Sequence, residues 1–144
     1  MSVSPFSIED LVPQAGSMIL LDQVMHWDVN EVICSSNSHR NVENPLRRDD
    51  MLPAIYGIEY GAQAIAVHGS LTGHGNPGYL AAIKDVQIRA ARLDDIPSEL
   101  RVHARRLLAD SGALIYAFSI IRADSGQLLV DGRISIFLTP GETT

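Results

Sequence analysis

Glu59 is the residue whose chemistry most needs an explanation, because it is a lone carboxylate in an apolar segment. Residues 52–67 predict a helix that is apolar on every face and begins at a proline. Such helices are buried, and a buried carboxylate is costly unless it is paired, hydrogen-bonded or protonated. Gln63 lies one helical turn further on, so we expect its side chain to touch and orient Glu59. Glu59 is therefore either a structural carboxylate or a catalytic group.

The spacing of the histidines predicts no metal centre. His68 lies about half a revolution from Glu59 on a regular helix, so we expect it to be packed and not to share a pocket with Glu59. None of the other histidines has a second ligand at a useful spacing. We therefore expect neither a metal nor another cofactor. The histidines expected at the surface or in loops are His26, His74 and His103.

Length and composition exclude several classes of protein. A chain of 144 residues, 46% of them hydrophobic, fits a single globular domain that spans residues 1–144. A net charge of −6 argues against a nucleic-acid surface. The lone Cys34 cannot form an internal disulfide and is expected to be a small buried residue. With no signal-peptide pattern and no apolar run long enough for a membrane span, we expect a cytoplasmic protein.

The order of predicted elements indicates the fold. Residues 18–27 and 31–38 flank a turn and are expected to pair as a hairpin before the long helix, which should end between Gly69 and Gly75. Four segments then predict strands that form an antiparallel meander: 78–91, 100–108, 113–122 and 127–138. A curved antiparallel sheet wrapped around one buried helix is the α+β hotdog fold, in which a second copy could cover the rest of the helix.

Three segments resemble the β-hydroxyacyl-[acyl-carrier-protein] dehydratases of the FabA/FabZ type. Residues 11–24 (LVPQAGSMILLDQV) resemble the family's opening "LxPHRxPxLLxDRV", with Gln14 where the family usually has histidine. Residues 52–63 are similar to "MPGxxxxEAxAQ", with Ala54 in place of glycine, and residues 78–86 are like the strand that follows the helix. The loop that begins Ser-His-Arg also resembles predicted dehydratases from aryl-polyene clusters.

The resemblance implies a catalytic histidine at the end of the second strand and a carboxylate on the helix. The carboxylate corresponds to Glu59. A gap-free count assigns the histidine position to Pro45, so His39 takes the role if residues 40–50 contain an insertion. We adopt His39, because it ends a strand as the family's histidine does. The alternative is that His39 is an ordinary surface histidine.

Dehydration of a 3-hydroxyacyl thioester needs a base, an acid and donors to the thioester oxygen. His39 suits the base, since histidine titrates near neutral pH, and Glu59 suits the acid if burial keeps it protonated. The N–H groups of Ala54 and Ile55 at the helix start would bind the oxygen. Gln63 completes the expected substrate-binding set.

The resemblance also implies partners. In the family the histidine of one subunit meets the carboxylate of the other, so activity requires a homodimer or a heterodimer with another hotdog subunit. The substrate would be carried by an acyl carrier protein, which is acidic and needs a basic patch on the enzyme. The arginines that flank the mouth of the proposed active site are Arg40, Arg47 and Arg48. The alternative arginines are Arg89, Arg92, Arg101, Arg105 and Arg106.

Two other functions stay open. A hotdog thioesterase would use the helix carboxylate to activate water and would not need His39. A non-catalytic subunit would pair with an active dehydratase or bind acyl chains, as the changes at Gln14 and Ala54 would allow. The acyl chain length, and whether the chain has an aryl cap, cannot be read from the residues.

Overall fold

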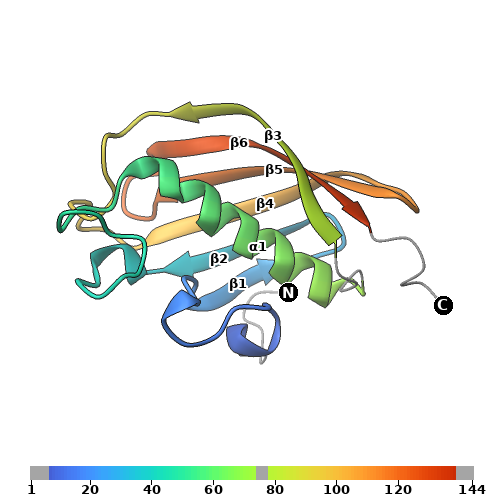
Figure 1. Cartoon of the computed structure of the whole chain (residues 1–144), viewed down its shortest axis with the longest axis horizontal. Helices are drawn as coiled ribbons and strands as arrows, with labels where there is room; N and C mark the ends of the chain where they lie inside the picture. Colours follow the sequence, from blue (N-terminus) through green and yellow to red (C-terminus); the bar gives the residue numbers. More distant parts are fainter. Residues whose placement is uncertain (1–6, 74–77, 139–144) are drawn as a thin grey trace.

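One α-helix lies across one face of an antiparallel sheet in the computed structural model, which describes residues 7–73 and 78–138 (Figure 1). The helix is α1 (Gly57–Leu71), and a short 3-10 turn, η4 (Ala54–Tyr56), precedes it. Three further 3-10 turns are η1 (Ile8–Asp10), η2 (Gly16–Met18) and η3 (Ser38–Arg40). The six strands are β1 (Gln23–Trp27), β2 (Glu31–Ser36), β3 (Gly78–Ile88), β4 (Leu100–Ala109), β5 (Ala113–Arg122) and β6 (Leu128–Leu138). This is the predicted hotdog arrangement.

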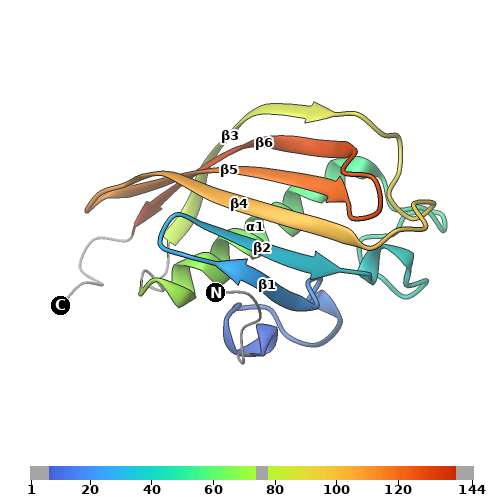
Figure 2. The ribbon, with the colours of Figure 1, turned by 180° about the vertical axis from the view of Figure 1, so that it is seen from behind.

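The sheet order corrects the predicted four-strand meander. The strands are ordered β1-β2-β4-β5-β6-β3, so only β4, β5 and β6 form a meander. β3 pairs with β6 at the far edge of the sheet, from Gly78 opposite Leu138 to Ile88 opposite Val130. Residues 89–99 then cross the end of the sheet to reach β4 (Figure 2). That crossing segment is held to the start of the helix, where the Leu93 N–H donates to the Leu52 carbonyl at 2.8 Å.

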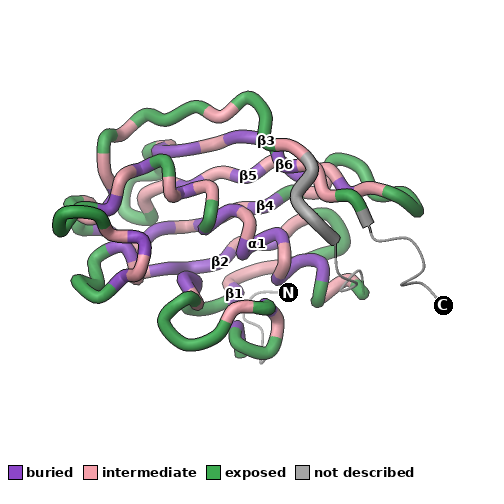
Figure 3. The backbone as a smooth tube through the Cα atoms, viewed as in Figure 1, coloured by how far each residue is buried: buried purple, intermediate pink, exposed green. Residues whose placement is uncertain are grey.

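Alternating side chains on the central strands form the core beneath the helix. Along β5 every second residue is buried, from Leu114 to Ile120, as expected for a strand with one face on the core. Figure 3 shows the buried residues gathered in α1 and the strands behind it, and the exposed ones in the loops at the two ends of the sheet and along the edge strand β3. Cys34 on β2 is fully buried, as predicted, and burial raises the pKa of its thiol to about 12.

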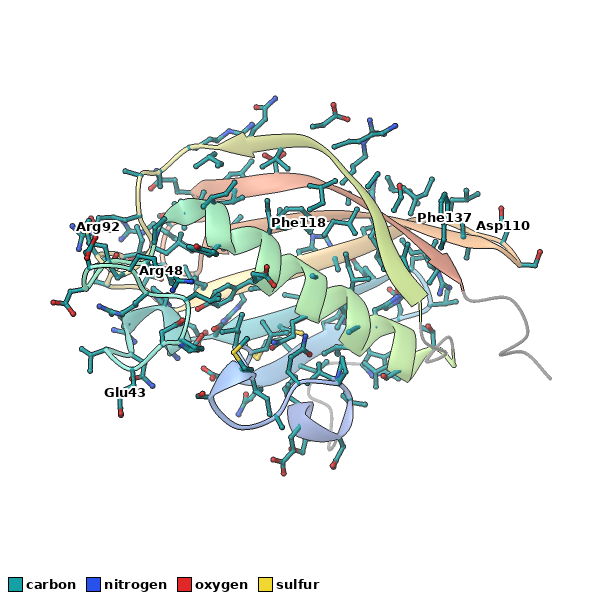
Figure 4. The ribbon with its side chains drawn as sticks, viewed as in Figure 1. Glu43, Arg48, Arg92, Asp110, Phe118 and Phe137 are labelled. Atoms are coloured by element: carbon teal, nitrogen blue, oxygen red, sulfur yellow. The ribbon has the colours of Figure 1, made fainter. Side chains whose placement is uncertain are left out.

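Two glycines let the backbone of α1 lie directly against side chains of the sheet. A Cβ at Gly57 would lie 2.9 Å from Ile120, and one at Gly61 would lie 2.6 Å from the ring of Phe118. Phe118 projects from β5 toward the helix (Figure 4). Neither glycine has a positive φ, so both are needed for space and not for backbone conformation.

This chain leaves one stripe of α1 and of the preceding turn open to solvent. Tyr60, Ala64 and Val67 are fully buried, whereas Glu59 is exposed and Ile55 of η4 is 45% exposed. Glu59 is therefore not buried within one chain, contrary to expectation, because the sheet and the segment before β1 cover the other faces of the helix. No helix among the described residues is long and apolar enough to cross a membrane.

We expect Gly61→Ala to destabilise the protein. Alanine favours a helix over glycine by about 1 kcal/mol. Overpacking costs about 1–3 kcal/mol, and the clash involves the Phe118 ring and its Cβ at 3.0 Å, so we expect the upper part of that range. Urea unfolding should show a net loss of about 1–2 kcal/mol. Gly112→Ala, where the nearest atom lies 3.9 Å away, is the matched control. Equal unfolding midpoints for both variants would contradict the close approach.

Candidate functional site

His39 is buried and held in one tautomer. It lies in η3, directly after β2, with no exposed surface. Its Nε2 lies 3.1 Å from the carbonyl oxygen of Ile96 and 3.0 Å from that of Ser98. Carbonyls only accept hydrogen bonds, so Nε2 must carry the proton and Nδ1 must keep its lone pair. Nδ1 has no hydrogen-bond partner among the described residues.

The neutral form of His39 is favoured by its surroundings. Burial lowers the pKa of the imidazole below its ordinary value, and the nearby charge of Arg40 acts in the same direction. The two carbonyl contacts oppose this shift but do not outweigh it. His39 is therefore a neutral imidazole whose unprotonated nitrogen has a fixed direction, which is the state a general base requires.

Tyr60 connects the helix to the loop that carries His39, residues 37–50, which we call the histidine loop. Its hydroxyl lies 2.8 Å from the Ser38 Oγ and accepts a hydrogen bond of 3.0 Å from the Asn44 Nδ2. Asn44 also donates to the Ser38 carbonyl at 2.9 Å, which closes the loop upon itself. Burial raises the pKa of Tyr60, so the phenol stays protonated. We did not predict these three residues as part of the site, although a tyrosine in an apolar helix was a signal that its hydroxyl needs a partner.

Residues 40–50 form a tightly bonded loop. Arg48 and Met51 exchange backbone hydrogen bonds of 2.7 and 3.0 Å around Asp49 and Asp50, both with positive φ. This is the pattern of a type I′ turn, which aspartate tolerates. The guanidinium of Arg47 donates to the carbonyls of Asp50, at 3.0 Å, and His39, at 3.4 Å. A groove of about 630 Å³ lies between this loop and residues 16–22, and Ser38, Asn44 and Pro45 are among the residues that line it.

Glu59 lies on the outward side of α1. It is exposed and forms no hydrogen bond or ion pair with any residue in the described part of the chain. His39 is turned toward the carbonyls of residues 96 and 98. Within one chain, the two predicted catalytic side chains therefore do not contact each other: Glu59 faces solvent, and His39 is buried against backbone carbonyls.

Gln63 does not orient Glu59, contrary to our expectation. It is 2% exposed, and its Oε1 accepts hydrogen bonds from the N–H groups of Leu20, at 2.8 Å, and Leu21, at 3.3 Å. Its Nε2 donates to the Met18 carbonyl at 2.8 Å. The Gln63 amide thus pairs with backbone N–H and carbonyl groups of an irregular segment, which would otherwise be buried without partners. Gln63 therefore anchors the segment before β1 to the helix.

The two amides predicted to bind the thioester oxygen differ in availability. The Ala54 N–H donates to the Ala91 carbonyl at 3.1 Å, and the Ala54 side chain is buried. The Ile55 N–H forms no hydrogen bond among the described residues. Of the two predicted amides, Ile55 alone is a free donor among the described residues, because the crossing segment before β4 occupies Ala54.

The arginines of the predicted basic patch are not neutralised by carboxylates. Arg40 donates to the Pro97 carbonyl and to the Asn37 side chain, and Arg47 donates to two backbone carbonyls. Arg48 lies 5.5 Å from the centre of the Tyr56 ring, in a cation–π contact. Glu43, Asp49 and Asp50 share the loop, but no ion pair to these arginines is present among the described residues. By contrast, Arg89, Arg92 and Arg101 form ion pairs with Asp131, Asp94 and Glu99.

His68 is packed, as predicted. It has no exposed surface, and its Nδ1 lies 2.6 Å from the Tyr116 hydroxyl. Its Nε2 lies 2.9 Å from the Asp28 carbonyl. This histidine joins the end of α1 to β5 and to the hairpin between β1 and β2. His74 lies outside the described residues.

We expect His39 to make stability depend on pH. Unfolded histidine has a pKa of about 6.5, whereas the pKa of folded His39 is lower, so the unfolded chain binds more protons between the two values. The contribution is complete above about pH 6.5 and is lost as the pH falls toward the folded pKa. Urea unfolding between about pH 5 and pH 8 should show a shallower loss for His39→Gln, whose amide can donate to the same carbonyls. Parallel curves would contradict a lowered pKa.

Comparison with known proteins defines the family. The model of the ApeP-like family, described as ApeP dehydratase, matches residues 6–144. No curated protein sequence is significantly similar to the chain. Among solved structures, the dehydratase heterocomplex ApeI:P from Xenorhabdus doucetiae matches with a TM-score of 0.81 and 24% identity, over 96% of this chain and 94% of that chain.

Thioesterases share the same architecture. Zebra fish thioesterase superfamily member 2 has a TM-score of 0.70 and 14% identity, over 92% of this chain and 93% of its own. A Haemophilus influenzae thioesterase has a TM-score of 0.67 and 10% identity, over 94% and 92%. At such identities these structures support the hotdog fold alone. The family match extends over nearly the whole chain, and the chain belongs to the ApeP-like dehydratase family.

Proposed function

We propose that the chain, together with a second hotdog subunit, removes water from a 3-hydroxyacyl-[acyl-carrier-protein] thioester to give the trans-2-enoyl thioester, in fatty-acid or aryl-polyene synthesis. The observation that carries the proposal is the fixed tautomer of His39 in a chain of a dehydratase family. A buried neutral imidazole with one oriented lone pair suits removal of the proton next to a thioester carbonyl.

Each step of the proposed reaction is assigned to one group of the protein. His39 Nδ1 takes the proton from C2, and the electron pair moves into the thioester, whose oxygen accepts a hydrogen bond from the free Ile55 N–H. The pair then forms the C2–C3 double bond as the C3–O bond breaks. Glu59, as the acid, gives its proton to the departing hydroxyl, which leaves as water. The proton held by His39 returns to the carboxylate to complete the cycle.

The second subunit is required because one chain keeps the two groups apart. Glu59 is exposed beside the partly exposed Ile55 and Ile58, and cover by a partner would remove these side chains from water. A carboxyl group held in an apolar contact favours its protonated form, which the acid role needs. The ApeI:P structure is a dehydratase heterocomplex, which supports a heteromeric partner here, and a homodimer is the other possibility.

The carrier protein is proposed to dock at Arg40, Arg47 and Arg48. These side chains surround the histidine loop and contact uncharged oxygens or an aromatic ring, so their charge is available to an acidic partner. Arg48 lies at the same end of the molecule as the crossing segment that carries Arg92 (Figure 4). Arg92 is a weaker candidate, since Asp94 already neutralises it.

A non-catalytic partner subunit is the second candidate. The His39 ring has no exposed surface in the single chain, so catalysis requires the loop over it to open when partner and substrate bind. If that opening does not occur, the chain would stabilise or shape an active subunit without taking part in chemistry.

Turnover of a 3-hydroxyacyl carrier-protein thioester tests the chemical roles. We expect the chain, alone or mixed with a hotdog partner, to form the enoyl product, detected by mass as loss of water. His39→Gln and Glu59→Gln should each lower kcat by about 10²–10⁴-fold, the usual cost of losing an acid or base. Glu9→Gln, the same change at an exposed glutamate outside the site, should leave kcat unchanged.

The other outcomes discriminate the alternatives. Release of free thiol without an enoyl product would identify a thioesterase. Activity only in the mixture, at equal rates for wild type and both site variants, would identify a non-catalytic subunit. Either result would overturn the proposed roles of His39 and Glu59.

Neutralising the arginines should impair docking and leave the chemistry intact. We expect the Arg40→Gln/Arg48→Gln double variant to raise KM for the carrier-protein thioester by several-fold, because rim charges act chiefly on encounter. Its kcat, and its kcat/KM for the same acyl group on free pantetheine, should match wild type. Arg105→Gln, at an exposed alternative arginine of β4 with no ion pair to a described residue, is the control and should leave KM unchanged. An unchanged KM in the double variant would place the docking surface elsewhere.

A further inference from the structure

The hairpin between β1 and β2 gathers potential metal ligands far from His39. One nitrogen of His26 and one carboxylate oxygen each from Asp28 and Glu31 lie within 4.8 Å of one another. The His26 Nε2 is 3.5 Å from the Asp28 Oδ2 and 3.6 Å from the Glu31 Oε2. Around a tetrahedral ion with bonds of about 2.0–2.2 Å, neighbouring ligand atoms lie about 3.3–3.6 Å apart. The spacing around His26 therefore suits such an ion.

Each carboxylate has one oxygen held by the protein and one left toward His26. The Asp28 Oδ1 accepts hydrogen bonds from the N–H groups of Asn30, at 2.7 Å, and Glu31, at 3.0 Å. The Glu31 Oε1 lies 2.6 Å from the His103 Nε2. The second oxygens, Asp28 Oδ2 and Glu31 Oε2, are thus held in place before any ion binds.

Sheet pairing brings the fourth residue to the cluster. His103 lies opposite Ile33 in the pairing of β2 with β4, so it sits diagonally from Glu31 on the same face. The pairing of β1 with β2 has an irregularity between Val24 and His26, and such bulges re-aim side chains. The expectation that no histidine has a second potential ligand nearby is wrong for His26. It is also wrong for His103, whose neighbour Glu31 is distant in sequence and is brought close by the pairing of β2 with β4.

We propose that His26, Asp28 and Glu31 bind a divalent transition-metal ion, with Zn²⁺ as the best match, and that His103 orients Glu31 from behind it. One imidazole and two carboxylates are ligands that zinc accepts, and water would complete the tetrahedron. A histidine hydrogen-bonded to a ligating carboxylate is a common outer-shell arrangement. The two carboxylates also balance the charge of the ion. The side chains of the three ligands are 28–47% exposed, so an ion can reach them from solvent.

The site would be separate from the proposed reaction. The hairpin lies at one end of β2, whereas His39 follows the other end of that strand (Figure 1). Metal binding can therefore be measured without any turnover, and its outcome does not depend on the dehydratase proposal.

Zinc titration of chelator-stripped full-length protein tests the proposal. In competition with a chromophoric chelator, we expect one Zn²⁺ per chain. His26→Ala and Glu31→Gln should each weaken binding at least about tenfold, and His103→Gln by about 10–100-fold, the usual effect of an outer-shell change. Asp28→Asn keeps the oxygen that bonds the turn and removes the charge, so it should weaken binding without unfolding the hairpin.

Asp110 supplies the matched control. Its Oδ1 accepts hydrogen bonds of 2.8 Å from Gly112 and Ala113 in the hairpin between β4 and β5, the same kind of turn as at Asp28 (Figure 4). Asp110→Asn should bind zinc like wild type, and circular dichroism should show equal folding for all variants. Absence of stoichiometric binding in wild type, or equal affinity in wild type and His26→Ala, would overturn the site.

Discussion

The near-backbone contact between α1 and the sheet is the constraint on which the rest of the structure depends. Gly57 and Gly61 leave no room for a Cβ against Ile120 and Phe118, so the rotation of the helix about its axis is fixed. Once that face is fixed, Tyr60 must point into the protein and Glu59 must point away from the sheet. The helix has no freedom to bury its carboxylate within the same chain.

The polar groups next to this contact are satisfied by backbone, and this organises the site. Gln63 pairs with the irregular segment before β1, and Tyr60 with the loop after β2. His39 pairs with two carbonyls of the segment that crosses to β4. Three loops that are distant in sequence therefore meet at one end of the sheet. Because buried polar groups are costly when unpaired, movement of one loop is coupled to the others.

Charge is distributed unevenly over this acidic chain. Most arginines on the sheet and its loops are paired with aspartate or glutamate, whereas those around the histidine loop contact carbonyls, an amide and an aromatic ring. An ion pair at the surface adds little stability, but it removes a charge from a partner's reach. A protein of net charge −6 can in this way keep a local positive surface beside its candidate site.

The sequence alone determined the strands, the helix and the fold, because hydrophobic alternation and turn residues are local signals. It placed β5 at its observed bounds and identified Cys34 and His68 as packed. It could not decide that β3 pairs with β6, because strand order is set by a long crossing segment and not by local pattern. Nor could it show that Gln63 turns to the backbone, that Ala91 occupies the Ala54 amide, or that Glu59 is exposed. Those outcomes depend on which face of α1 meets the sheet and which segments meet at its ends, and both are properties of tertiary packing.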